Sequence, residues 1–157
     1  MPIGPFTHTN TGSWSSGHGR VNVIVKVEAT AGTYYAGAPA GGFWKSTNDG
    51  ATWETYTDNL PQIGVSGIAV DYGNPGTIYI ATGDDDGGDS ASIGVMKSTN
   101  GGLNWNTTGL NAGNTPSSMN DIYVSPTNSN IIWVATNNGV YKSTNAGISW
   151  NNNNNTQ

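Results

Sequence analysis

The sequence contains no cysteine among its 157 residues. A disulfide framework, a thiol nucleophile, a zinc–thiolate site and thiol redox chemistry are therefore excluded. The absence does not assign a cellular compartment, because a protein without cysteine is compatible with either an oxidising or a reducing environment.

Positive charge and long apolar runs are also scarce. Lys and Arg total 5 residues against 10 Asp and Glu, which gives a formal net charge of −5 at pH 7. Because a nucleic-acid-binding surface needs several cations to neutralise successive phosphates, nucleic acid is not an expected partner. No run of about 18 apolar residues occurs, and no basic region followed by an apolar run opens the chain. The sequence therefore predicts no membrane contact, and no signal peptide within these residues.

What the sequence does contain is one eight-residue pattern, S-T-N-x-G-x-x-W, in three copies. The copies occupy residues 46–53, 98–105 and 143–150, so that their tryptophans are 52 and 45 residues apart. This period is typical of a four-stranded propeller blade and is longer than a helical repeat of about 34 residues. The pattern therefore indicates an all-β repeat protein.

Each copy ends a series of short segments rich in β-branched and aromatic residues, which is typical of β-strands. Strand A of each repeat is expected at 21–27, 66–72 and 120–125, strand B at 33–38, 77–83 and 131–136, and strand C at 42–48, 94–100 and 139–145. Strand D is expected to begin at the tryptophan of each motif. Gly, Pro and Asn at 71–76 and 125–130 favour tight A–B turns. The prediction is three antiparallel blades at 19–57, 65–108 and 118–157, the last with an Asn-rich tail, and a segment 1–18 that closes a blade.

The repeated motif resembles the Asp-box, or bacterial-neuraminidase repeat, S-x-D-x-G-x-[ST]-W, with Asn in place of Asp. The surrounding segments GRVN at 19–22, AGAPAGGFWKST at 36–47 and IATGDDD at 80–86 are similar to secreted bacterial repeat proteins with sortilin-like or xyloglucanase-like propellers. The resemblance covers about residues 17–151. It implies a β-propeller fold, a secreted or cell-surface parent, and ligand sites on the face formed by the B–C and D–A loops.

The motif residues themselves are assigned structural roles in the C–D turns. The Asn side chain is expected to accept turn amides, the Gly to adopt a positive φ, and the Trp ring to cover the turn. These residues are Ser46, Asn48, Gly50 and Trp53, then Ser98, Asn100, Gly102 and Trp105, then Ser143, Asn145, Gly147 and Trp150. The lysine that precedes each motif is likewise expected to support strand C.

Three blades are fewer than the roughly four to eight that close a propeller. An open arc exposes strand edges and apolar faces at both ends, which favours association. The sequence therefore predicts a homo-oligomer, either a dimer with six blades or a trimer with nine. The remaining interpretations are that the chain is part of a larger propeller or an engineered or excised fragment without activity of its own.

The candidate binding and catalytic residues lie mainly between strands B and C of the second repeat. Asp84, Asp85, Asp86 and Asp89 form an acidic loop, which is either solvated or a Ca²⁺ site built from Asp84, Asp86 and Asp89. No other cofactor is expected. Asp84 and Asp121 are the candidate acid and base, because glycosidic cleavage needs two carboxylates on either side of the scissile bond.

A second group of candidates precedes the first strand. Arg20 is expected either to bind a ligand anion or to pair with Asp121 or a backbone carbonyl, while His18 and the ring of Trp14 are further ligand-binding candidates. Sialidase activity is not expected, because the resemblance implies three arginines and the chain has one. The favoured function is a non-catalytic binding or assembly module that binds a glycan, and the alternative is a xyloglucanase-like glycoside hydrolase.

Overall fold

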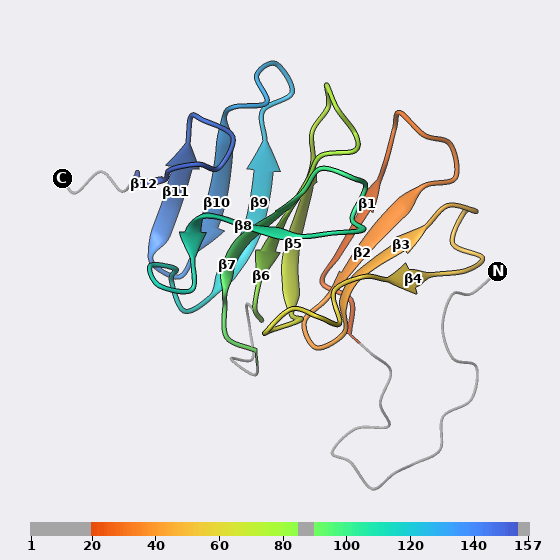
Figure 1. Cartoon of the computed structure of the whole chain (residues 1–157), viewed down its shortest axis with the longest axis horizontal. Helices are drawn as coiled ribbons and strands as arrows, with labels where there is room; N and C mark the ends of the chain where they lie inside the picture. Colours follow the sequence, from red (N-terminus) through yellow and green to blue (C-terminus); the bar gives the residue numbers. More distant parts are fainter. Residues whose placement is uncertain (1–19, 85–89, 154–157) are drawn as a thin grey trace, which may run out of the picture.

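The computed structural model describes residues 20–84 and 90–153, and its strands form three antiparallel sheets of four strands each (Figure 1). Blade 1 consists of β1 (Val23–Lys26), β2 (Tyr34–Ala38), β3 (Gly42–Ser46) and β4 (Glu54–Thr55). Blade 2 consists of β5 (Val65–Val70), β6 (Ile78–Thr82), β7 (Gly94–Ser98) and β8 (Asn106–Asn111). Blade 3 consists of β9 (Met119–Val124), β10 (Ile132–Thr136), β11 (Gly139–Ser143) and β12 (Asn151–Asn152). The predicted all-β class and the partial propeller are confirmed.

The expected strands A, B and C agree with the observed strands to within two residues at each end, and two further differences concern strand D. Strand D begins one residue after each motif tryptophan, as at Glu54 in blade 1, because the tryptophan still belongs to the turn. In blade 2 the outer strand continues to Asn111, past the expected end at residue 108. There Thr108 Oγ1 accepts the amide of Leu110 at 3.3 Å, and the fully buried Leu110 side chain anchors the extension in the core.

The three blades lie side by side in an open arc. Their inner strands are neighbours, with β1 next to β5 and β5 next to β9. The A–B turns emerge at the upper edge in Figure 1, and the B–C and D–A loops emerge at the lower edge. This is the arrangement that the strand order predicts.

The hydrophobic core consists of two clusters, one between each pair of neighbouring blades. In the first, Tyr35 and Phe43 of blade 1 pack against residues such as Ile80 of blade 2. In the second, residues such as Tyr79 and Val95 of blade 2 pack against Ile122, Ile132 and Val134 of blade 3. Because successive side chains of a strand point to opposite faces, the middle blade is covered on both sides, and all of β6 is buried.

Each motif closes its C–D turn with the same set of hydrogen bonds. In blade 2, Ser98 Oγ accepts the amides of Asn100 and Gly102 at 3.3 and 2.9 Å, and Asn100 Oδ1 accepts the amide of Asn104 at 3.0 Å. The turns at 46–52 and 143–149 repeat these bonds. The motif glycines have φ angles of 81°, 89° and 87°, a region in which an L side chain is strained.

The motif tryptophans differ in their partners. Trp53 and Trp150 donate Nε1–H to the carbonyls of Gly50 and Gly147, each at 3.1 Å. Trp105 instead packs edge-on against Phe43 of blade 1, with ring centroids 5.0 Å apart, and its buried Nε1 makes no hydrogen bond to any described residue. The Trp105 ring therefore stabilises the interface between blades 1 and 2 and does not form a hydrogen bond that closes its own turn.

Lysine side chains provide a second link between blades. Lys45 Nζ of blade 1 donates to the carbonyl of Gly101 in the blade 2 motif at 3.0 Å, and Lys97 Nζ of blade 2 donates to the carbonyl of Ala146 in the blade 3 motif at 3.4 Å. Tyr79 Oη donates to the same Ala146 carbonyl at 3.3 Å. The turn motifs of blades 2 and 3 are therefore each held by the blade that precedes them.

Candidate functional site

An ion pair connects the first two blades at the lower edge. Arg20, just before β1, places Nη2 2.5 Å from Oδ1 of Asp84, which follows β6. The Asp84 side chain is 3% exposed and that of Arg20 is 43% exposed. The Asp84 amide also donates to the Ser90 carbonyl at 2.9 Å, which holds the ends of the acidic loop together. A carboxylate buried to this extent needs a compensating charge, and Arg20 supplies it.

Asp84 is thus a partner of Arg20 that the sequence did not indicate, and the role of Arg20 as a ligand contact stays a prediction. The reason for this pairing is topological, since the chain enters β1 at the same edge of the fold at which it leaves β6. Asp121 lies in β9, is exposed, and accepts the amide of Ile122 at 2.8 Å. Asp84 and Asp121 therefore have separate partners, and their role as an acid–base pair stays a prediction.

The other candidates of this edge lie outside the described residues, namely Trp14, His18, Asp85, Asp86 and Asp89. Within the two described ranges, no group of three His, Cys, Asp or Glu side chains is arranged to hold a metal ion. Because two of the three proposed Ca²⁺ ligands are not among those residues, the calcium site also stays a prediction.

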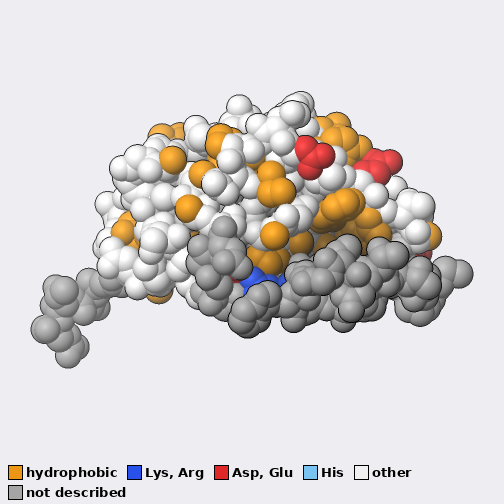
Figure 2. All heavy atoms as spheres, turned by 90° about the horizontal axis from the view of Figure 1, so that it is seen from below, with side chains coloured by type: hydrophobic (Ala, Val, Ile, Leu, Met, Phe, Trp, Pro, Cys, Tyr) orange, Lys and Arg blue, Asp and Glu red, His pale blue; other side chains and the backbone are white. Residues whose placement is uncertain are grey.

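Figure 2 views the lower edge from below and shows mainly uncharged polar and backbone atoms, with scattered apolar side chains and little red or blue. Grey atoms cover part of this face. The visible described surface therefore offers no concentration of charge for an ionic ligand.

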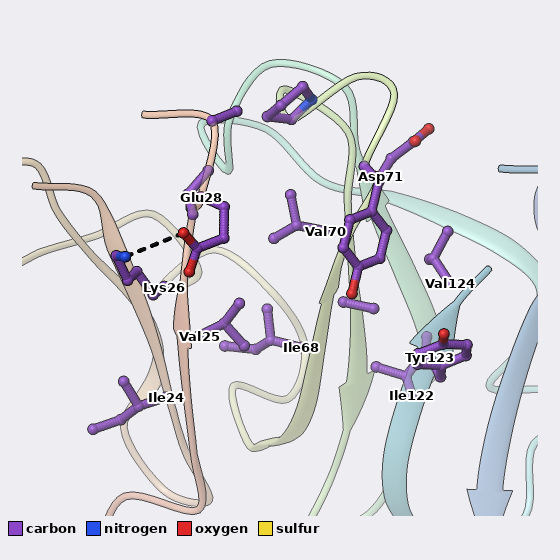
Figure 3. Close-up of a pocket in the computed structure, with 15 residues that line it drawn as sticks. Ile24, Val25, Lys26, Glu28, Ile68, Val70, Asp71, Ile122, Tyr123 and Val124 are labelled. Atoms are coloured by element: carbon purple, nitrogen blue, oxygen red, sulfur yellow. Dashed lines mark hydrogen bonds and ion pairs between the residues drawn. The ribbon is translucent and has the colours of Figure 1, made fainter. Parts of the chain in front are cut away.

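A groove of about 740 Å³ lies along the inner strands, toward the ends that lead into the A–B turns (Figure 3). Its walls come from all three blades, at 24–29, at 68–72 with Pro75, and at 122–124. Most of these side chains are aliphatic. The groove lies at the end of the inner strands opposite to the loop face that the Asp-box resemblance implies.

Few charged groups stand in this groove. Lys26 Nζ donates to Glu28 Oε2 at 3.1 Å, drawn as a dashed line in Figure 3, and this hydrogen bond raises the pKa of Lys26 above its ordinary value. Asp71 is 7% exposed, and its Oδ1 accepts the Gly73 amide at 2.9 Å and the Ser129 hydroxyl at 2.6 Å. The polar groups are thus engaged within the protein, and the free surface is largely apolar.

Two tyrosines are the exposed aromatic side chains that line the groove, Tyr72 at 62% exposure and Tyr123 at 48%. The bonds of Asp71 fix the turn that carries Tyr72. Tyr123 lies between Ile122 and Val124 in β9. The side chains of Ile122 and Val124 are buried on one face of the strand, and the side chain of Tyr123 is exposed on the other. Sequence reasoning did not single out Tyr123 as a ligand contact, although the strict alternation around it marks the side chain as facing away from the core.

Comparison with known proteins supports the fold. The chain is similar to the GH74 xyloglucanase of Xanthomonas campestris, with 20% identity and a TM-score of 0.66 over 86% of this chain and 21% of that one. A GH74 enzyme of Niastella koreensis shows 27% identity and a TM-score of 0.65 over 90% of this chain and 22% of that one. YCF48 bound to a D1 peptide shows 15% identity and a TM-score of 0.63 over 85% of this chain and 39% of that one.

The fold thus belongs to the β-propeller class, and the chain spans about a fifth of the GH74 enzymes and two fifths of YCF48. Neither a protein-family model nor a curated protein sequence matches this chain. In the part of the chain that the structure describes, no helix is long and apolar enough to cross a membrane. These comparisons define the architecture, a set of propeller blades.

Proposed function

We propose that the chain is a non-catalytic binding and assembly module from a secreted or cell-surface Asp-box propeller protein. The observation that carries the proposal is the burial of Asp84 against Arg20. A glycosidase needs two carboxyl groups that reach the scissile bond, at separations of about 5 to 9.5 Å. A carboxylate that is 3% exposed and held by a guanidinium is not available to a substrate.

We further propose a glycan as the ligand of the inner-strand groove. Tyr72 and Tyr123 present aromatic surface beside aliphatic side chains, and amphipathic rings of this kind are common contacts in binding sites. The similarity to xyloglucanases makes a β-linked polysaccharide the first ligand to test. An aromatic, weakly charged groove also suits a neutral sugar better than an ionic ligand.

The experiment is a titration of the chain with soluble xyloglucan and related polysaccharides by calorimetry. Tyr72→Ala and Tyr123→Ala are each expected to weaken binding about ten-fold, which corresponds to about 1.4 kcal/mol. Tyr56→Ala is the matched control, because Tyr56 is also exposed, at 37%, but lies outside the groove. Binding that is unaffected by both groove variants contradicts the assignment of the groove.

The alternative function is a glycoside hydrolase, which the similarity to GH74 enzymes and the exposure of Asp121 favour. A reducing-end assay on the same polysaccharides separates the two functions. Release of reducing ends that Asp84→Asn or Asp121→Asn abolishes would overturn the non-catalytic proposal. A chain that assembles but neither binds nor cleaves a glycan fits the remaining interpretation, a fragment without activity of its own.

A further inference from the structure

The two interfaces between blades follow one pattern of contacts, which also describes the exposed face of blade 3. We call the side of a blade that meets the next blade its forward face. The register aligns Tyr35 with Lys45 in blade 1, Tyr79 with Lys97 in blade 2, and Trp133 with Lys142 in blade 3. A ring beside a lysine is therefore the centre of every forward face.

On the first two forward faces, this pair receives the turn motif of the following blade. Lys45 and Lys97 donate to the carbonyl of the residue before the motif glycine, at 3.0 and 3.4 Å. The Tyr35 and Tyr79 rings beneath them are 3% and 1% exposed. The forward face of a blade is thus shaped to hold a turn motif.

The forward face of blade 3 has the same groups in a more exposed state. Lys142 Nζ lies 5.4 Å from the centroid of the Trp133 ring, and Tyr123 packs against that ring at 5.9 Å while remaining 48% exposed. Val140 stands at the repeat position of the fully buried Phe43 and Val95, and it is 40% exposed. No fourth turn motif among the described residues lies over these side chains.

The turn motif of blade 1 is the complementary surface at the other end of the arc. Asp49 occupies the position of Gly101 and Ala146, and all three have left-handed φ angles, of 56°, 71° and 55°. The Asp49 carbonyl is therefore presented like those that Lys45 and Lys97 bind. The side chain adds an exposed carboxylate that neither internal turn has at this position.

The sheet beside this turn also has the features of a contact face. In blade 2 the corresponding face presents Ile68 and Ile80, which are 5% and 0% exposed against blade 1. Blade 1 carries Ile24 at the position of Ile68, and it is 58% exposed. An aliphatic side chain that is buried at the internal interface is thus repeated on the open face.

We propose that the forward face of blade 3 binds the turn motif and open face of blade 1 in a second copy of this chain. In this contact Lys142 donates to the carbonyl and carboxylate of the partner's Asp49. The contact continues the internal interface pattern and places opposite charges together at its centre. Such a head-to-tail contact closes a ring when the rotation between copies allows it. The inference rests on the assembly part of the proposed function, and its central contact, between Lys142 and Asp49, lies outside the groove proposed for the glycan, although Ile24 and Tyr123 line both surfaces.

A charge-swap series tests this contact on the intact chain. Sedimentation equilibrium is expected to show that the wild type associates, and Lys142→Glu and Asp49→Lys to weaken association about ten-fold or more. The double variant D49K/K142E restores it. Asp58→Lys is the matched control, because it makes the same charge change at an exposed residue of the loop that follows blade 1.

Mixing the two single variants determines the number of copies. In a mixed dimeric ring, each interface joins position 142 of one variant to position 49 of the other. Both interfaces then hold one glutamate or aspartate against one lysine, so the equimolar mixture recovers association. In a trimer, one interface must join like charges, and recovery is incomplete. Circular dichroism of each variant checks that its fold is intact.

Two outcomes overturn the proposal. One is a wild type that stays a single chain at every concentration, which would leave the face to another occupant such as further blades of a longer polypeptide. The other is an associating wild type on which the single variants act no more strongly than Asp58→Lys. Glycan binding is judged here with Tyr72→Ala alone, because Tyr72 lines the groove but lies outside the forward face of blade 3, whereas Tyr123 packs against Trp133 on that face. A failure of glycan binding therefore does not affect the charge-swap result.

Discussion

Val95→Ala and Val140→Ala are the same substitution at the same repeat position in two blades. Val95 lies in β7, is fully buried and belongs to the core cluster between blades 2 and 3. Val140 lies in β11 and is 40% exposed on the forward face of blade 3. Local strand structure and side-chain chemistry are matched in the two variants. Their difference in the free energy of unfolding therefore measures what the following blade contributes by burying this side chain.

The expected magnitudes follow from burial. The substitution removes two carbon atoms, which are worth about 0.8 kcal/mol each when buried, and the cavity left behind adds a further cost. Val95→Ala is thus expected to lower the free energy of unfolding by about 2 to 3 kcal/mol. Val140→Ala is expected to change it by less than about 0.5 kcal/mol in the separate chain, as exposed substitutions usually do.

Urea denaturation followed by tryptophan fluorescence measures both values, at dilutions where sedimentation shows single chains. The slope of free energy against urea must be unchanged, so that the midpoints report stability alone. Equal losses for the two variants would refute the conclusion that blade 3 buries Val95. At higher concentration, Val140→Ala is expected to weaken association, because docking of a second copy buries this side chain.

Gly102→Ala is expected to destabilise by about 2 to 4 kcal/mol, because its methyl group would lie 2.6 Å from Phe43 Cε1 at a φ of +89°; Gly101→Ala, at a position where blade 3 has alanine, should lower the melting temperature less. Ser98→Ala removes the acceptor of two turn amides and should cost about 1 to 3 kcal/mol in urea denaturation. Burial raises the pKa of Tyr35 above 10.0, so the folded state retains the hydroxyl proton at a pH where the unfolded chain loses it. The free energy of unfolding should therefore fall as the pH rises from about 10 through the raised pKa. Tyr35→Phe should reduce that loss of stability. The acidic loop at 84–89 is expected to be solvated, so a chelator should leave the melting temperature unchanged, whereas a decrease in the melting temperature would support the calcium site.

The strands were predictable because each blade repeats the same local chemistry. Apolar alternation, turn residues and three copies of one motif place twelve strands in three sheets, and the same spacing predicts which loops share an edge. The errors in strand boundaries arise where tertiary contacts, rather than the local sequence, determine where a strand begins or ends. Trp53 covers its turn instead of starting β4, and Leu110 extends β8 because its side chain is buried in the core.

The candidate site was less predictable, because it depends on contacts between blades. Nothing local to Arg20 indicates that its partner stands 64 residues later, in the loop after β6. The alternation of β9 indicates that Tyr123 is exposed, but the other walls of its groove come from blades 1 and 2. The sequence therefore indicated Arg20 and Asp84 as separate candidates, and only the fold shows that these two side chains form an ion pair.

A repeat makes differences between copies informative. Ser, Asn and Gly are identical in the three motifs because every turn uses them in the same hydrogen bonds and backbone conformation, whereas the residue before the glycine is Asp49, Gly101 or Ala146. The fold does not require a carboxylate there, since the two internal interfaces form without one. Its presence in the turn that no described blade covers, and of Lys142 on the matching open face, is accounted for if these two surfaces meet between copies. The charge-swap series tests that explanation directly, because the double variant keeps both charges and exchanges only their places.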